Sequence, residues 1–114
     1  MQKSSVENDK DWIKLIDKLH ALFGKSPDIN AILFLIGVQE IGKGRDNYSK
    51  EQKQELMHVG MCTILCTSGY YELIGKDKEG WPIFKELKKL PLFDLNEQEI
   101  FIKTHIKEYF SNLE

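Results

Sequence analysis

Apolar residues recur every three or four positions in several stretches of the chain, which is the spacing of amphipathic helices. The first stretch covers residues 9–23, and its predicted buried stripe consists of Trp12, Leu15, Ile16, Leu19, Leu22 and Phe23. The longest apolar run lies within residues 27–41. Ser26 is a favourable N-cap, Pro27 suits the first helical position and Gly42 suits the helix end, so this run predicts a central helix.

Two more helices are predicted after a polar loop. Ser49 and Gln52 have the spacing of a capping box, and the helix that they begin is expected to end before Gly69. The last helix is expected to begin at Asn96, which lies three residues before Glu99. Its predicted buried side is made of Ile102, Ile106, Tyr109, Phe110 and Leu113.

Residues 70–84 fit two descriptions. Tyr70–Ile74 suits a short strand or one more helical turn, and Lys76–Gly80 suits an exposed turn. Pro82 then begins either a return strand or a helix. The helical spacing of the apolar residues that follow favours a short helix from Pro82 to about Lys89.

The predicted fold is therefore all-α: a compact bundle of about four main helices with a short irregular or hairpin-like insertion around residues 70–82. A chain of 114 residues fits one domain. We expect a flexible N-terminal tail over residues 1–8 and a single helical domain over residues 9–114.

The charge and the cysteine content bear on the kind of partner and on the cellular compartment. A net charge of −2 gives no electrostatic case for a nucleic acid or an anionic membrane as the partner. The apolar run over residues 31–38 is too short to cross a bilayer, and the first apolar segment is amphipathic, unlike a signal peptide. Cys62 and Cys66 lie one helical turn apart, which is a poor geometry for a disulfide. These features predict a cytoplasmic protein with reduced thiols, and no cofactor is expected.

Residues 37–44 nearly match the phosphate-binding loop pattern G-x-x-x-x-G-K-[ST]. Gly44 stands where the pattern needs a hydroxyl for magnesium, and the residues after Lys43 are typical of a turn. The predicted helix also occupies the place where the pattern needs a strand. We therefore interpret the glycines as a helix end.

A metal site is a second hypothesis. His58, Cys62 and Cys66 follow at steps of four residues, so their side chains would lie on one side of a helix. Glu55 adds a Glu-x-x-His pair of the kind found in di-metal bundles. Steps of four lack the Cys-x-x-Cys spacing of common zinc sites, and the alternative is a packed stripe of cysteines.

A polar site at the end of the central helix is a third hypothesis. The loop before the next helix is short, which would bring Gln39 and Glu40 near Glu55 and His58. No catalytic residue can be assigned, and we lean against an enzyme without excluding one.

Aromatic residues mark a further candidate surface. Tyr71 and Trp81 flank the predicted turn, together with Tyr70 and Phe84, and Lys85, Lys88 and Lys89 follow. Aromatic side chains beside lysines can bind a partner protein, a small ligand or a single strand of nucleic acid. The alternative is that the rings cover the helical core.

Four segments resemble a family of small uncharacterised bacterial proteins. They are Ile36–Gly44, Glu55–His58, Gly69–Leu73 and Asp77–Pro82. The resemblance covers most of the chain and implies no activity, ligand or site.

We expect a binding or structural module that acts through a protein partner or a homo-oligomer. The alternative is a ligand- or metal-binding helical protein, with Gln39, Glu40, Glu55, His58, Tyr71 and Trp81 as the candidate ligand-binding residues.

Overall fold

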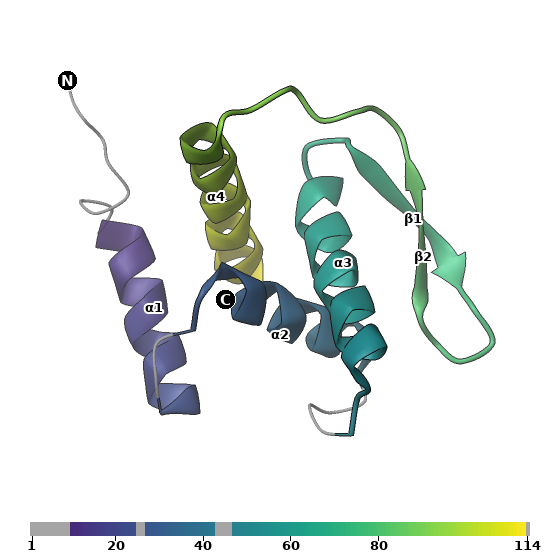
Figure 1. Ribbon diagram of the computed structural model, residues 1–114, viewed down its shortest axis with the longest axis horizontal. Helices are drawn as coiled ribbons and strands as arrows, with labels where there is room; N and C mark the ends of the chain where they lie inside the picture. The colour runs from purple at the N-terminus through teal and green to yellow at the C-terminus, as the bar shows by residue number, and fades with distance from the viewer. Residues whose placement is uncertain (1–9, 25–26, 43–46, 114) are drawn as a thin grey trace. The chain divides into compact units, whose positions relative to one another are not determined.

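The computed structural model describes residues 10–24, 27–42 and 47–113. Within these ranges the chain forms four helices and two strands (Figure 1). Their order is α1 (Lys10–Phe23), α2 (Ile29–Ile41), α3 (Lys50–Cys66), β1 (Tyr71–Lys76), β2 (Pro82–Glu86) and α4 (Leu95–Leu113). The expected tail over residues 1–8, the Ser26 cap, residues 43–44 and the side chains of Leu22 and Phe23 lie outside the described part.

Contacts within the chain divide it into two units. Unit 1 consists of Met1–Asp28 and Leu92–Glu114, and unit 2 consists of Ile29–Pro91. Unit 1 holds α1 and α4, and unit 2 holds α2, α3 and the β1–β2 hairpin. The prediction of one domain over residues 9–114 is not tested by this division.

The prediction of a mostly helical fold with four main helices is confirmed, but the fold is not purely all-α. The short helix predicted from Pro82 to Lys89 is wrong, because Pro82–Glu86 is strand β2. It pairs antiparallel with β1, in a register that runs from Tyr71↔Glu86 to Lys76↔Pro82. Helical spacing of apolar residues over so short a stretch was outweighed by backbone pairing with the strand before the turn.

Helices α2 and α3 make the closest contact in unit 2. A Cβ atom placed on Gly37 of α2 would lie 2.8 Å from the carbonyl carbon of Leu56 in α3, and closer still to its oxygen. A Cβ atom on Gly60 of α3 would meet the Leu33 carbonyl of α2 in the same way, 2.9 Å from its carbon. The absence of a side chain at both glycines therefore lets the two backbones touch at two points.

This double contact sits in an apolar core. Ile32 and Ile36 of α2 are fully buried, as are Leu56, Ile64 and Leu65 of α3. Helix α2 is apolar on nearly every side, and its last backbone bond joins the Gly42 N–H to the Val38 carbonyl at 2.9 Å. Gly42 has a φ of +71°, so the predicted glycine helix end is confirmed.

The caps of α3 and α4 use the same chemistry, and only the first was placed correctly from the sequence. The Ser49–Gln52 capping box of α3 is present, with bonds of 3.1 and 2.9 Å. The box of α4 is formed by Asp94 and Glu97, at 2.8 and 3.0 Å, so the predicted cap at Asn96 is wrong. Asp94 and Glu97 have the same i, i+3 spacing two residues earlier, so the helix begins two residues before the predicted start.

Unit 1 is held by a smaller set of contacts. Trp12 and Leu19 of α1 are buried, and so are Ile102 and Ile106 of α4. The Lys103 ammonium lies 5.0 Å from the centre of the Trp12 ring and 3.0 Å from the Glu99 carboxylate. Leu113 was predicted to be buried, but 54% of it is exposed at the end of the helix.

None of the helices in the described ranges combines the length and the apolar composition needed to cross a membrane.

The close backbone contact predicts that alanine at Gly37 or Gly60 destabilises the protein, although alanine stabilises most helices. In an ordinary helix interior, replacing glycine by alanine stabilises the protein by about 0.5–1 kcal/mol. We expect Gly37→Ala and Gly60→Ala to lower the free energy of unfolding instead, by about 1–3 kcal/mol, because the new methyl group would overlap a backbone carbonyl. Urea denaturation measures this change.

Gln39→Ala is the matched control, since Gln39 lies on the same helix and is exposed. Its effect should stay within about 0.5 kcal/mol. A stabilising effect of Gly37→Ala would contradict the close backbone contact.

Candidate acidic and aromatic groove

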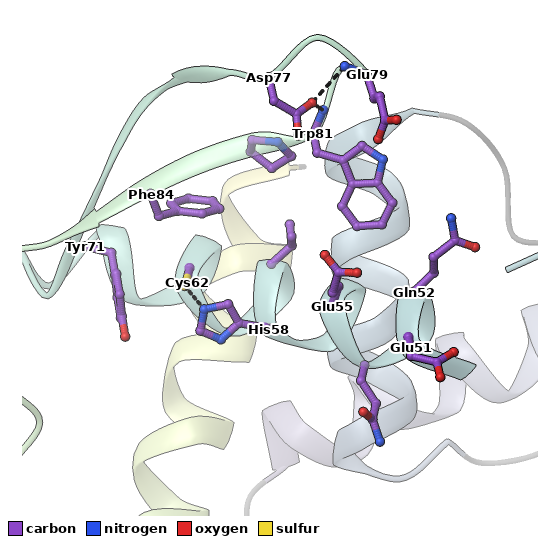
Figure 2. A pocket seen from close by; sticks show the side chains of 13 residues that line it. Glu51, Gln52, Glu55, His58, Cys62, Tyr71, Asp77, Glu79, Trp81 and Phe84 are labelled. Atoms are coloured by element: carbon purple, nitrogen blue, oxygen red, sulfur yellow. Dashed lines mark hydrogen bonds between the residues drawn. The ribbon is translucent and has the colours of Figure 1, made fainter. Parts of the chain in front are cut away.

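A groove of about 610 Å³ runs between α3 and the β1–β2 hairpin, entirely within unit 2 (Figure 2). We call it the acidic groove. Helix α3 contributes Glu51, Gln52, Gln54, Glu55, His58, Val59 and Cys62 to its lining, and the hairpin contributes Tyr71, Asp77, Glu79, Trp81, Pro82 and Phe84.

The hairpin turn is fixed by one carboxylate. An oxygen of Asp77 accepts hydrogen bonds from the backbone N–H groups of Glu79 and Trp81, both at 2.9 Å (Figure 2). The Asp77 N–H donates to the Trp81 carbonyl at 2.8 Å, and the Gly80 N–H donates to the Asp77 carbonyl at 3.0 Å. Asp77 therefore closes the turn on itself and sets the position from which the Trp81 side chain leaves the backbone.

Trp81 links the groove to the core. Its half-buried side chain packs against a buried cluster formed by Val38, Ile41 and Leu56. Leu56 is also the residue whose carbonyl meets Gly37. The close contact of α2 with α3 therefore helps to fix the floor on which the Trp81 ring rests.

The other end of the groove holds a histidine, a thiol and a phenol. The His58 Nε2 lies 3.4 Å from the Cys62 sulfur, and the His58 ring meets the Tyr71 ring edge to face, with centres 6.5 Å apart (Figure 2). Burial raises the pKa of the Cys62 thiol to about 11, with smaller contributions from Cys66 and Glu86. Burial also raises the pKa of the Tyr71 hydroxyl. Both groups are therefore neutral near pH 7, and Cys62 is not poised as a nucleophile.

The lining of the groove carries an excess of acidic side chains. Glu51 and Glu55 come from α3, and Asp77 and Glu79 come from the turn. Among the described residues that line the groove there is no lysine and no arginine. Carboxylates thus flank the aromatic rings of Trp81 and its neighbours, which is an arrangement that attracts positive charge.

The structure brings together part of the predicted ligand-binding set. Glu55, His58, Tyr71 and Trp81 all line the acidic groove. Gln39 is exposed on α2 and Glu40 is half-buried there, and neither is among the lining residues. The groove is thus centred on α3 and the hairpin, whereas the sequence suggested the end of α2.

The metal hypothesis gains no support from the arrangement. His58 and Cys62 are neighbours, and Cys66 is half-buried one turn further along α3. In the described ranges no group of three or more histidine, cysteine, aspartate or glutamate side chains could hold a metal ion. Metal binding by His58, Cys62 and Cys66 therefore stays a prediction without structural support.

Sequence reasoning missed most of the acidic side of the groove. Asp77 and Glu79 were interpreted only as parts of an exposed turn, and Glu51 was not singled out. A usable signal was present in Asp77-x-x-Gly80-Trp81, because an aspartate at the start of a tight turn often bonds to backbone N–H groups. Tyr71 and Trp81 both line the groove, Trp81 also packs against the core as the alternative expected, and the expected lysine neighbours are not among the lining residues.

Comparisons of the chain with models of protein families, with curated proteins and with solved structures found no match. The resemblance to small bacterial proteins therefore stays a prediction.

The raised pKa of Cys62 predicts slow alkylation with a shifted pH dependence. At pH 8 a thiol with a pKa of about 11 carries about a hundredfold less thiolate than one at the ordinary value of 9.0. In a Cys66→Ser variant, which keeps the burial that raises the pKa most, the rate of iodoacetamide labelling of Cys62 should still rise with pH well beyond the ordinary thiol pKa of 9.0. Mass spectrometry of the labelled peptide measures the rate.

The same variant unfolded in urea is the control, and its labelling should level off near the ordinary thiol pKa. Native labelling at pH 8 as fast as in the unfolded chain would show that Cys62 is an accessible, reactive thiol.

The Asp77 turn predicts a change around Trp81. Asp77→Ala removes the acceptor of two backbone hydrogen bonds, so the Trp81 side chain should become more exposed to water. We expect a red shift of tryptophan emission in a Trp12→Phe background, where Trp81 is the only remaining tryptophan.

Lys78→Ala serves as the control, because Lys78 is an exposed residue of the same turn. Unchanged emission in Asp77→Ala would mean that the turn holds its shape without this carboxylate.

Proposed function

We propose that this protein is a binding module that takes a positively charged segment of a protein chain in the acidic groove. The observation that carries the proposal is the composition of the groove: four carboxylates and the rings of Tyr71, Trp81 and Phe84, with no lysine or arginine in the described lining. A lysine or arginine side chain matches this lining both in charge and in shape.

The two halves of such a side chain would meet different parts of the groove. The charged head is attracted by carboxylates and by the faces of aromatic rings. The aliphatic stem is apolar and can lie along Trp81, Phe84 and Pro82. A ligand that was only apolar, or only charged, would use half of this surface.

The groove is also prepared for binding before a ligand arrives. Trp81 is held by the core cluster and by the Asp77 turn, and Tyr71 lies against His58. Rings that are already fixed lose little conformational entropy when a ligand packs on them. A volume of about 610 Å³ lies in the usual range for a ligand pocket, which a few residues of an extended chain can occupy.

A peptide titration tests the proposal. The probe is a capped hexapeptide of alternating lysine and leucine, and the control peptide has glutamate in place of lysine. We expect the lysine peptide to perturb Trp81 fluorescence in the Trp12→Phe background, and the glutamate peptide to have no effect.

Charge-neutral variants locate the binding. Glu51→Gln with Glu55→Gln should weaken lysine-peptide binding about tenfold or more, because two of the carboxylates lose their charge while keeping their size. The matched control is Glu97→Gln with Glu99→Gln on α4, which makes the same change of net charge at two residues that do not line the groove.

Equal weakening by both pairs would show that only net charge matters. Binding of the glutamate peptide as tightly as the lysine peptide would contradict the proposal.

A further inference from the structure

We infer that a second copy of this chain supplies the positively charged segment, and that the segment is Leu87–Leu92, with the sequence Leu-Lys-Lys-Leu-Pro-Leu. This inference rests on the proposed function of the acidic groove and names the partner. It follows from the exposure of the segment, from its charge and from the place where it is held.

The segment exposes apolar side chains between two structural elements. It lies after β2 and before α4, and it has neither helix nor strand. Leu87 is 49% exposed, Leu90 is 43% exposed and Leu92 is 101% exposed. Apolar side chains this open on a loop are typical of a surface that binds another molecule.

The charge of the segment is complementary to that of the groove. Lys88 and Lys89 are adjacent and exposed. In the described part of the chain, no hydrogen bond, ion pair or ring contact holds the Lys89 side chain. Leucines flank the two lysines, so the segment offers the same pairing of charge and apolar surface that the groove presents.

Pro91 makes the segment suitable for a groove. Proline disfavours helical geometry in the residue before it, so Leu90 is biased toward an extended conformation. Extended proline-containing segments commonly bind to grooves lined by aromatic rings, because little conformational entropy is lost. Trp81, Tyr71 and Phe84 provide such rings.

The segment is held away from the Glu55 end of the groove in its own chain. The Leu87 N–H donates to the Tyr70 carbonyl at 2.8 Å, and the Lys88 ammonium lies 4.5 Å from the centre of the Tyr70 ring. Tyr70 follows the C-terminal end of α3, whereas Glu55 lies about 16 Å before that end at a rise of ~1.5 Å per residue. A second copy can bring its segment to the groove without breaking these contacts.

Sedimentation velocity tests the inference on the full chain. From about 10 μM to about 1 mM, the wild-type protein should shift from monomer to dimer or larger species, the range expected for a weak interface. Raising the salt from about 0.05 M to about 0.5 M should weaken association severalfold, because the contact is between exposed charges.

Charge reversal gives the sharper test. One variant carries Glu51→Lys and Glu55→Lys in the groove, and the other carries Lys88→Glu and Lys89→Glu in the segment. Each variant alone should remain monomeric, because the first variant loses the net negative charge of its groove and the second carries negative charge on both groove and segment. An equimolar mixture should associate again, because the unaltered lysine segment of the first variant meets the unaltered acidic groove of the second.

Lys10→Glu with Lys14→Glu on α1 is the matched control, since it makes the same charge change at exposed lysines of unit 1. It should self-associate like the wild type. Circular dichroism checks that each variant is folded. If the variant with Glu51→Lys and Glu55→Lys is unfolded, the variant with Glu51→Gln and Glu55→Gln is used in its place.

A wild-type protein that stays monomeric at about 1 mM would overturn the inference. So would a mixture of the two reversed variants that sediments as monomers. If the lysine peptide still binds in that case, the proposed function stands and its partner is a different protein. If neither the peptide nor a second copy binds, the proposed function fails as well.

Discussion

The contact between the backbones of α2 and α3 is the constraint on which unit 2 depends. Gly37 admits the carbonyl of Leu56, and Gly60 admits the carbonyl of Leu33, so each helix provides one glycine and one leucine. Two such points hold α3 in a single position against α2. The apolar sides of both helices then close around the contact, and the polar side of α3 is left to face the hairpin.

The groove follows from that placement. Helix α3 ends at Cys66, and the chain returns as β1 and β2 beside the same helix (Figure 1). Asp77 closes the turn, Trp81 leaves it toward the core cluster, and the carboxylates of both elements face the space between them. One carboxylate thus has a structural role, while the others give the site its charge. A surface that only binds a ligand needs no reactive side chain. The Cys62 thiol, which is neutral near pH 7, agrees with such a role.

The sequence allowed the four helices to be predicted because their signals are local. Ser49 and Gln52 mark a cap, and Gly42 marks a helix end, whatever the rest of the chain does. A hairpin-like insertion was one of the predicted alternatives, but its second strand was predicted as a helix because Ile83 and Phe84 fit helical spacing, whereas strand pairing depends on the residues across the turn. The groove was half predicted for the same reason. His58 and Trp81 were singled out one at a time, but only the register of the hairpin brings Asp77 opposite α3.

The most direct test of the account is to observe where a bound lysine side chain lies. Isotope-filtered nuclear Overhauser spectra of the labelled protein with the unlabelled lysine–leucine peptide would report contacts between the two. The account predicts contacts from the lysine methylene protons to the rings of Trp81 and Tyr71. Contacts confined to the exposed Ile74 and Ile83 of the hairpin, or to α1 and α4, would contradict it.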